Sequence, residues 1–352
     1  MLPEFSLGAF IALQIGGLAL FVSLAVTGFA RLGGLGDVPD GRSAHSRTTP
    51  TAGGLGIVAG VGAAFLAAAL FHADTLFAQP GTAQKLASLT AIAFALGLLG
   101  LVDDRIVVPT RLKFGLILLL SLFAANAVGS VTMLPFGKDH IYLLWWSGLA
   151  GTALWLFTVT NAVNFMDGIN GLIGGSLAVA SGALCALAVK AGAPVTALMS
   201  GAVCAALTGF LPYNFRVKAA VFCGDCGSLT AGFLYAASVL MLVHEQPEMR
   251  LLYAGPLLVM PLLADVLLTL ARKPFVGIRL TAPHSTHVYQ RAARTIGSHV
   301  VISLIYAGLA VLLAGLVHHA FGRGTLGSML GLGMISGMFA ALYAVAATNL
   351  RG

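Results

Sequence analysis

The chain has 352 residues, of which 58% are apolar and 9% are charged, and its mean hydropathy is +0.95. Soluble domains carry about 25% charged residues, so these values exclude an ordinary cytosolic enzyme, a secreted disulfide scaffold, a disordered tail and a coiled coil. The net charge of +7 is spread over short loops between apolar runs, which favours a membrane surface over a nucleic acid as its partner.

The apolar runs predict an all-α polytopic membrane protein, because a backbone in lipid must satisfy its own hydrogen bonds. Eleven runs are expected to be helices, at approximately 7–30, 52–73, 84–102, 114–131, 142–162, 172–190, 195–212, 228–244, 251–271, 298–319 and 326–347. Those at 172–190 and 195–212 are near the short limit for a span. We therefore expect one integral membrane domain over residues 1–352, with about 10–11 transmembrane helices.

The basic residues are distributed unevenly between the two sides of the membrane. If the N-terminus is outside, the inner loops and chain end hold fourteen Lys and Arg residues and the outer loops hold five. Because inner loops carry an excess of Lys and Arg, this distribution predicts an outside N-terminus and an inside C-terminus.

Acidic residues gather on the same inner side of the predicted bundle. They are Asp37, Asp40, Asp103, Asp104, Asp167, Asp225 and Asp265. Acids do not follow the positive-inside rule, so their position needs another cause. Carboxylates beside many bases are typical of a Mg²⁺-dependent site for a polyphosphate substrate.

The first inner loop is rich in donors suited to phosphate. Arg42, His45 and Arg47 lie within it, and charged donors of this kind bind phosphate oxygens well. The alternative is an anchor loop that follows the positive-inside rule and binds no ligand.

The second inner loop opens with two adjacent carboxylates, Asp103 and Asp104, and Arg105, Arg111 and Lys113 follow. A carboxylate pair at the membrane edge is unfavourable unless it binds something, and such a pair suits a general base or a metal ligand. The alternative is a solvated pair of helix-end acids balanced by Arg105.

The third polar segment ends the fifth apolar run and contains Asn161, Asn164, Asp167 and Asn170. Their spacing of three would place them roughly on one helical face. Oxygen donors in such a row suit Mg²⁺ or a nucleotide. The alternative is a hydrogen-bonded helix terminus.

The fourth segment places Asp225 beside Gly224 and shortly before Ser228. We expect a turn before the eighth run, where small residues allow close approach of a phosphate or metal. Cys223 and Cys226 have CxxC spacing, but no second pair completes a zinc site. The alternative is a helix-capping acid.

The fifth segment lies in the longest inner loop and contains His284, His287, Arg291 and Arg294. An HxxH pair alone is a weak metal signal, and two arginines beside it favour anion binding. The alternative is a set of ordinary surface side chains.

Taken in this order, the five segments resemble one family, the polyprenyl-phosphate N-acetylhexosamine-1-phosphate transferases of the glycosyltransferase family 4 type. The Asp103–Asp104 pair, the NAVNFMDG run from Asn161 and the GDCGS run from Gly224 carry the resemblance together. Relatives begin O-antigen, enterobacterial common antigen and teichoic acid synthesis, and the phospho-N-acetylmuramoyl-pentapeptide transferase of peptidoglycan synthesis is more distant.

The resemblance implies that a polyprenyl (undecaprenyl) phosphate attacks a UDP-N-acetylhexosamine and that UMP is released. It also implies a Mg²⁺ cofactor, with Mn²⁺ as an alternative, and a multi-pass protein of the bacterial inner membrane with its active site on the cytoplasmic face. The pathway implied is an O-antigen-like cell-envelope polysaccharide or lipopolysaccharide. The oligomeric state is left open, a homodimer included.

Individual roles follow from the resemblance by position. The metal ligands implied are Asp225 and Asn164. The catalytic residues implied are Asp103, Asp104, Asp167 and His287, with the aspartate pair as base for the lipid phosphate or as organisers of the phosphates. The substrate-binding residues expected are Arg42, His45, Arg47, Lys113, Asn161, Asn170, His284 and Arg291.

Three positions depart from the family pattern. Asn170 stands where many members have an acid, and Ser43 follows Arg42 where a basic residue is usual. The last loop reads HSTHVYQR, which is most similar to the O-antigen or capsule branch. This weakens the muramoyl-pentapeptide alternative without removing it.

An alternative from another functional class is that the protein is a membrane transporter with ion sites on its inner face. That reading predicts ionisable residues deep within the spans, and Asp265 is the one candidate in the sequence. Release of UMP from UDP-sugars would distinguish the enzyme from the transporter.

Overall fold

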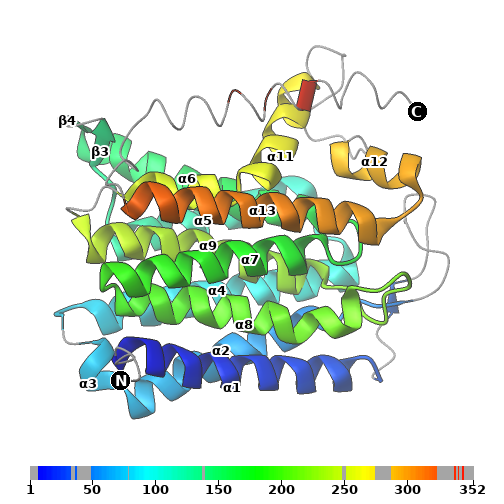
Figure 1. The fold of residues 1–352 in the computed structure, drawn as a ribbon, viewed down its shortest axis with the longest axis horizontal. Coiled ribbons are helices and arrows are strands. Elements are labelled where there is room, and N and C mark those ends of the chain that lie inside the picture. Colours follow the sequence, from blue (N-terminus) through cyan, green and yellow to red (C-terminus); the bar gives the residue numbers. More distant parts are fainter. Residues whose placement is uncertain are drawn as a thin grey trace.

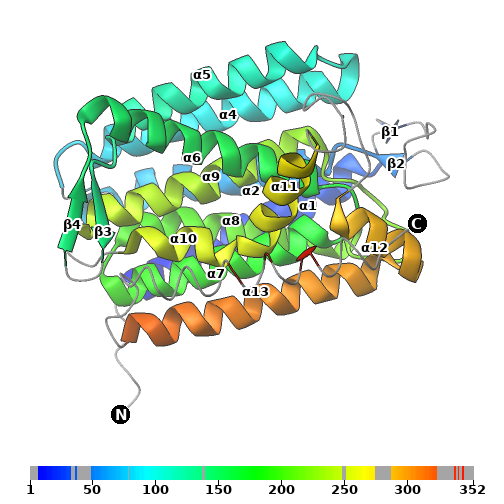
Figure 2. The same cartoon turned by 90° about the horizontal axis from the view of Figure 1, so that it is seen from above.

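The computed structural model describes residues 7–32, 36–37, 49–77, 79–136, 139–247, 251–273 and 287–322, with residues 337, 340, 343 and 344 near the C-terminus. Within these ranges the chain is a bundle of long, nearly parallel helices (Figure 1). Consecutive helices run in alternating directions, so their connections fall at the two ends of the bundle (Figures 1 and 2).

Nine of the described helices are long and apolar enough to cross a membrane. They are α1 (Leu7–Ala30), α2 (Gly53–Phe71), α4 (Thr82–Ile106), α5 (Thr110–Val128), α6 (Trp145–Met166), α7 (Leu172–Ala191), α8 (Pro194–Asn214), α9 (Gly224–Glu245) and α13 (His299–Gly322). The all-α polytopic fold is therefore confirmed. The two runs that looked short for a span, α7 and α8, are helices of 20 and 21 residues.

The ninth predicted run is not one straight span. It contains a short 3-10 helix, η2 (Leu251–Tyr253), followed by α10 (Ala254–Leu258) and α11 (Met260–Arg272), and the chain bends by 71° before α11. Pro261 in the first turn of α11 has no N–H to continue the previous helix, which favours a break there. Counting this pair as one span gives ten in the described part of the chain. The predicted eleventh run, 326–347, lies largely outside the described residues.

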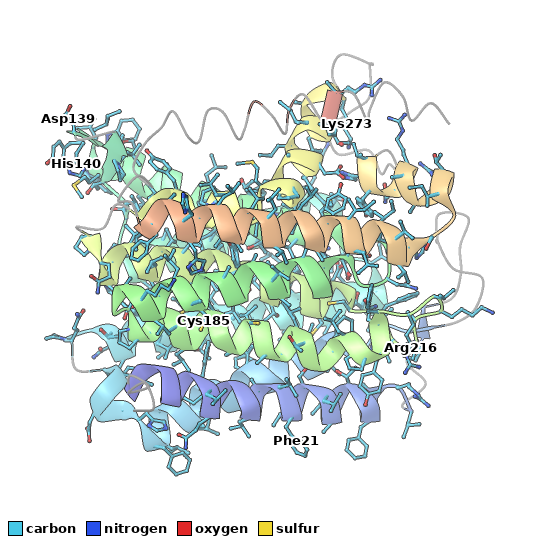
Figure 3. The ribbon with its side chains drawn as sticks, in the orientation of Figure 1. Phe21, Asp139, His140, Cys185, Arg216 and Lys273 are labelled. Atoms are coloured by element: carbon cyan, nitrogen blue, oxygen red, sulfur yellow. The ribbon has the colours of Figure 1, made fainter. Side chains whose placement is uncertain are left out.

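Small elements lie at the two ends of the bundle. Strands β1 (Gly36–Asp37) and β2 (Thr49–Pro50) pair at one end, together with helix α12 (Val288–Ile296), as Figure 2 shows. The opposite end carries α3 (Ala73–Leu76) and an antiparallel hairpin of β3 (Met133–Phe136) and β4 (Asp139–Tyr142). Figure 3 places Asp139 and Arg216 at these opposite ends.

Helix α9 forms the centre of the bundle, and 94% of its spanning window is buried. It packs against α2, α4, α6 and α8. Small residues let the backbones approach closely, as membrane helices require: a Cβ on Gly54 would lie 2.6 Å from Cα of Gly227. Because α9 is fixed on all sides, its first turn is a rigid place for functional side chains.

The outer helices present apolar side chains to their surroundings. Phe21 on α1 is 67% exposed and points away from the bundle in Figure 3, and Phe123 on α5 and Leu304 on α13 are also exposed. Such a surface is expected where lipid, not water, is the solvent. The outward pattern agrees with the predicted membrane class.

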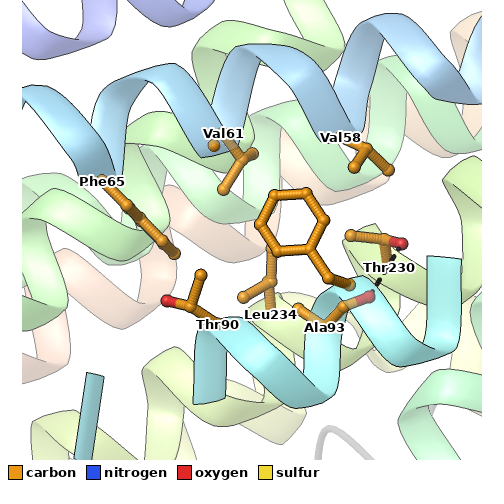
Figure 4. Close-up of a pocket in the computed structure, with 9 residues that line it drawn as sticks. Val58, Val61, Phe65, Thr90, Ala93, Thr230 and Leu234 are labelled. Atoms are coloured by element: carbon orange, nitrogen blue, oxygen red, sulfur yellow. Dashed lines mark hydrogen bonds between the residues drawn. The ribbon is translucent and has the colours of Figure 1, made fainter. Parts of the chain in front are cut away.

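A small apolar hollow lies between α2, α4 and α9 (Figure 4). Its lining consists of Val58, Val61, Gly62, Phe65, Thr90, Ala93, Phe94, Thr230 and Leu234. The Thr230 hydroxyl donates within its own helix to the carbonyl of Cys226 at 2.8 Å. The lining of the hollow contains no charged residue.

Candidate active site

One end of the bundle collects most of the predicted site residues. The C-terminal ends of α4 and α6 meet the N-terminal ends of α5 and α9 there, because alternate helices reverse direction (Figure 2). Segments that are distant in sequence thus supply side chains to one small volume.

The centre of this volume is the ammonium group of Lys113, in the first turn of α5. Nζ of Lys113 lies 2.8 Å from Oδ2 of Asp103 and also contacts Oδ2 of Asp225. Oδ1 of Asn164 lies 3.4 Å from the same nitrogen. Lys113, Asp103, Asn164 and Asp225 together are called the Lys113 cluster below. The Lys113 side chain is 12% exposed, so its positive charge balances two carboxylates where water is scarce.

Asp225 lies in the first turn of α9, which begins at Gly224. The expected turn before the helix is therefore wrong by about one turn of helix, because α9 starts earlier than the apolar run does. Oδ1 of Asp225 accepts a hydrogen bond from Nδ2 of Asn164 at 2.7 Å. The same amide donates to Oγ of Ser228 at 2.9 Å, so Asn164 is fixed between two residues of α9.

Asp104 has a different environment from Asp103, although the two are adjacent. Its Oδ1 accepts the backbone N–H of Asp225 at 2.9 Å, and its Oδ2 accepts that of Cys226 at 3.3 Å. A carboxylate at a helix N-terminus satisfies free N–H groups and matches the helix dipole. Gly224 has φ +69, and a Cβ there would lie 2.6 Å from Oδ2 of Asp104, so this close contact requires glycine.

Asp103 faces the other way, toward α5. Its Oδ1 accepts the backbone N–H of Val108, while its Oδ2 contacts Lys113. Between them, Val107 has φ 40, a strained conformation for a β-branched residue. The connection from α4 to α5 is held in this form by Asp103.

Asp167 follows the last residue of α6, and its side chain is half-buried. Removal from water, followed by the negative charges of Asp225 and Asp104, raises the pKa of Asp167 well above its usual range. The expected single helical face is wrong, because α6 ends at Met166. Asp167 joins the cluster from the helix end, and Asn170 lies in the turn beyond it.

The two outer asparagines of that predicted face are placed elsewhere. Asn161 is 5% exposed and donates to the carbonyl of Phe157 at 2.7 Å, within its own helix. Asn170 is 7% exposed and donates to the carbonyl of Arg216 at 2.9 Å. Both are outside the Lys113 cluster, and their substrate-binding role stays a prediction.

The end of the first inner loop contacts the start of α9. The backbone N–H groups of Gly53 and Gly54 donate to the carbonyls of Phe222 and Cys223 at 3.1 and 2.9 Å. This loop therefore approaches the cluster at the base of α2. The predicted phosphate donors Arg42, His45 and Arg47 lie outside the described residues, as does His284.

The described part of the last inner loop lies against the end of α6. The ring of His287 is 6.4 Å from that of Phe165 between centroids, and Oη of Tyr289 donates to the carbonyl of Phe165 at 2.9 Å. Phe165 follows Asn164 in the chain and also packs against Phe114, the neighbour of Lys113, at 6.1 Å. His287 is thus beside the cluster, while Arg291 lies half-buried on α12.

The sequence placed Asp265 among the inner-side acids and as the one candidate for the transporter alternative, and it did not predict the contacts that this residue makes. In the structure Asp265 is 2% exposed and binds the start of α12. Its place in an apolar run was the available signal, since a buried carboxylate must have several hydrogen-bond donors.

The cluster's chemistry fits a hard cation bound together with phosphate. Within the described ranges, no three His, Cys, Asp or Glu side chains are grouped so that they could hold a metal by themselves. Oxygens of Asp103, Asn164 and Asp225 nevertheless converge on one positive charge, that of Lys113. Mg²⁺ commonly takes one or two protein oxygens and completes its shell with water and substrate phosphates.

Comparison with known proteins shows the family to which the chain belongs. Residues 86–243 match the sequence profile of Glycosyl transferase family 4, a stretch that includes most of α4, all of α5, α6, α7 and α8, and most of α9. A decaprenyl-phosphate N-acetylglucosaminephosphotransferase of Mycobacterium tuberculosis is 30% identical over 335 residues, covering 88% of this chain and 82% of that protein. The chain belongs to glycosyl transferase family 4.

Two further relatives are named for the transfer of different sugar phosphates. A probable undecaprenyl-phosphate N-acetylglucosaminyl 1-phosphate transferase of Bacillus subtilis is 28% identical over 263 residues, covering 72% of this chain and 68% of that protein. A phospho-N-acetylmuramoyl-pentapeptide-transferase of Shouchella clausii is 29% identical over 290 residues, covering 78% and 86%. The family resemblance drawn from the motifs is therefore confirmed.

Proposed function

We propose that this family 4 member transfers N-acetylhexosamine 1-phosphate from a UDP-sugar to polyprenyl phosphate and releases UMP. The observation that carries the proposal is the Lys113 ammonium held by Asp103 and Asp225 at one end of a membrane bundle. Relatives named for N-acetylglucosamine 1-phosphate transfer to undecaprenyl or decaprenyl phosphate support UDP-N-acetylglucosamine as donor.

In the proposed reaction, an oxygen of the lipid phosphate bonds to the β-phosphorus of the UDP-sugar. The bond from that phosphorus to the oxygen shared with the α-phosphorus breaks, and UMP leaves with that oxygen. The product is a polyprenyl diphosphate sugar. Phosphoryl transfer of this kind depends on positioning and on stabilising negative charge.

In the proposed reaction, the residues of the site have different roles. Lys113 binds phosphate charge, and Asp103 receives a proton from a monoanionic lipid phosphate or orients its dianion. Asp104 has both oxygens engaged by the start of α9, which supports a role as organiser. Asp225 and Asn164 would hold Mg²⁺, or Mn²⁺ in its place, and the metal would neutralise charge on the diphosphate.

We further propose that the cluster faces the cytoplasm of a bacterial inner membrane, where UDP-sugars are found. The described basic residues support this orientation through the positive-inside rule. At the end that holds the cluster lie Arg31, Arg105, Arg111, Lys113, Arg216, Lys218, Arg291 and Arg294, whereas Lys85 and Lys190 lie at the other. In this orientation the reaction would be the first membrane step of an O-antigen-like cell-envelope polysaccharide.

A second candidate is transfer of phospho-N-acetylmuramoyl-pentapeptide in peptidoglycan synthesis. The relative of this name from Shouchella clausii is matched over 86% of its length, which is the observation that favours it. The donor sugar alone separates the two candidates.

A panel of donors tests both candidates. Purified full-length protein is incubated with undecaprenyl phosphate, Mg²⁺ and one UDP-sugar at a time, and UMP is measured. We expect UMP from UDP-N-acetylglucosamine or a 6-deoxy-N-acetylhexosamine analogue, and little from an Asp225→Asn control. UMP from UDP-N-acetylmuramoyl-pentapeptide alone would select the second candidate, and no UMP from any donor would contradict the proposal.

A further inference from the structure

The carboxylate of Asp265, in α11, receives more donors than any simple helix cap requires. Its side chain is 2% exposed. A carboxylate has about four lone-pair positions, and five groups lie within hydrogen-bond distance of this one. The groups within hydrogen-bond distance are Nδ1 of His287 at 3.2 Å, the backbone N–H groups of Val288 and Tyr289 at 3.0 and 2.9 Å, Oη of Tyr306 at 2.7 Å and Oγ1 of Thr269 at 3.4 Å.

These contacts join three elements that are separate in sequence. Val288 and Tyr289 are the first two residues of α12, so Asp265 satisfies N–H groups that have no partner within that helix. Tyr306 belongs to α13. Asp265 therefore fixes the bent segment, the last inner loop and the next span relative to one another.

The ring of His287 is held on several sides. It lies 5.8 Å from the Tyr289 ring and 6.4 Å from the Phe165 ring between centroids. The backbone N–H of His287 donates to Oε1 of Gln290 at 3.3 Å, so the residue is fixed at the start of α12. Asp265 favours a proton on Nδ1, and a charge-assisted hydrogen bond is roughly twice as strong as a neutral one.

We propose that Asp265 is a positioning residue for the transferase, because it keeps a proton on Nδ1 of His287 and so directs the Nε2 edge of the ring to the substrate. This inference rests on the proposed function, in which His287 meets the diphosphate or sugar. Orientation of a functional histidine through its second nitrogen is a general device. Loss of such a partner typically lowers activity about 10–100-fold.

The first test measures directly which ring nitrogen of His287 carries a proton, and it needs no substrate. Histidine rings are labelled with ¹⁵N in the full-length protein in nanodiscs, and the His287→Gln variant identifies one signal among the nine histidines. We expect the wild-type Nδ1 to carry a proton at neutral pH. A neutral ring with its proton on Nε2 alone would overturn the proposal, whether or not the protein proves to be a transferase.

The second test is a double-mutant cycle on UMP release. Asp265→Asn keeps the shape but turns an NH₂ group toward donors, and we expect kcat to fall about tenfold or more. In a His287→Gln background the same change should cost at most about twofold, because coupled residues are not additive. An equal loss in both backgrounds would show a merely structural role and overturn the proposal while leaving the transferase intact.

A matched control is Tyr306→Phe, which removes one donor from Oδ2 and leaves the His287 contact in place. We expect kcat to change by at most about twofold, with Nδ1 still protonated. If Asp265→Asn does not fold, the ring measurement on the wild type still decides the question.

Discussion

Asp104 accepts the backbone N–H of Asp225 at 2.9 Å, so the second member of the aspartate pair fixes the first turn of the helix that carries the proposed metal ligand. Asp103, one residue earlier, contacts Lys113 instead. The two adjacent carboxylates therefore have different partners: Asp104 binds the first turn of α9, and Asp103 binds Lys113.

Replacement of Asp103 by Asn should lower turnover on the order of a hundredfold or more, the range for loss of a general base. The change is nearly isosteric, and the new amide oxygen can still accept the N–H of Val108. The NH₂ group then faces the ammonium of Lys113, but the Asp103 side chain is 15% exposed and water can reach it, so folding and UDP-sugar binding should persist. Initial rates of UMP release and a donor-binding assay check this. Wild-type turnover would leave Asp103 with a structural role only.

Replacement of Asp104 by Asn should destabilise the protein more than the same change at Asp103. The new NH₂ group would face the N–H of Asp225 or of Cys226, and an unpaired buried donor costs about 1–3 kcal/mol. Thermal unfolding in detergent should show a lower Tm for Asp104→Asn, with Asp103→Asn as the matched comparison. Equal Tm values for the two variants would argue against the division of roles.

Lys113→Met should abolish UMP release, since the variant keeps the unbranched chain, one atom shorter, and removes the charge between Asp103 and Asp225. Arg111 lies in the same first turn of α5 and is exposed, so Arg111→Gln is the control and should retain most activity. If both variants lost activity equally, a general effect of positive charge would explain the result better than a specific contact.

The orientation of the bundle is tested by cysteine labelling of intact cells. A probe at Asp139, on the hairpin, should react from outside, and one at exposed Arg216 should react only after permeabilisation (Figure 3). The native Cys223 and Cys226 are buried, so the unsubstituted chain provides the background. The reverse pattern would place the cluster on the wrong face for UDP-sugars.

Most of the fold could be predicted from the sequence, because hydropathy and length determine which segments can cross a lipid bilayer. The break between α10 and α11 was missed because the run reads as one apolar stretch, and Pro261 favours a break there without giving the 71° angle of the bend. The start of α9 was misplaced because Gly224 and Asp225 are helical without being apolar.

The membership of the site was easier to predict than its contacts. Asp103, Lys113, Asn164 and Asp225 stood out as polar residues at the ends of apolar runs. Which of them touch depends on contacts between residues 112 or 61 positions apart, and sequence spacing carries no such information. The Asp265 network is hidden for the same reason, since its donors come from α11, α12 and α13.

The proposed metal requirement is tested by removing a ligand and by removing the metal. Asp225→Ala should abolish activity, and EDTA should abolish wild-type activity until Mg²⁺ is restored, because the described residues include no group of three ligating side chains that would hold the ion tightly. Zn²⁺ should not substitute, since it prefers nitrogen and sulfur ligands. Full activity in EDTA, with contaminating metal removed, would defeat the assignment of Asp225 and Asn164.

The most direct test of the proposed reaction follows the β-phosphate of the donor. UDP-N-acetylglucosamine labelled with ³²P at the β-position is incubated with the protein, Mg²⁺ and undecaprenyl phosphate, and the lipid and nucleotide fractions are separated. Transfer of sugar 1-phosphate predicts label in the lipid fraction, unlabelled UMP in the aqueous one, and neither product from Lys113→Met. Label retained in UDP would mean that the sugar moves without its phosphate, and it would contradict the proposed reaction.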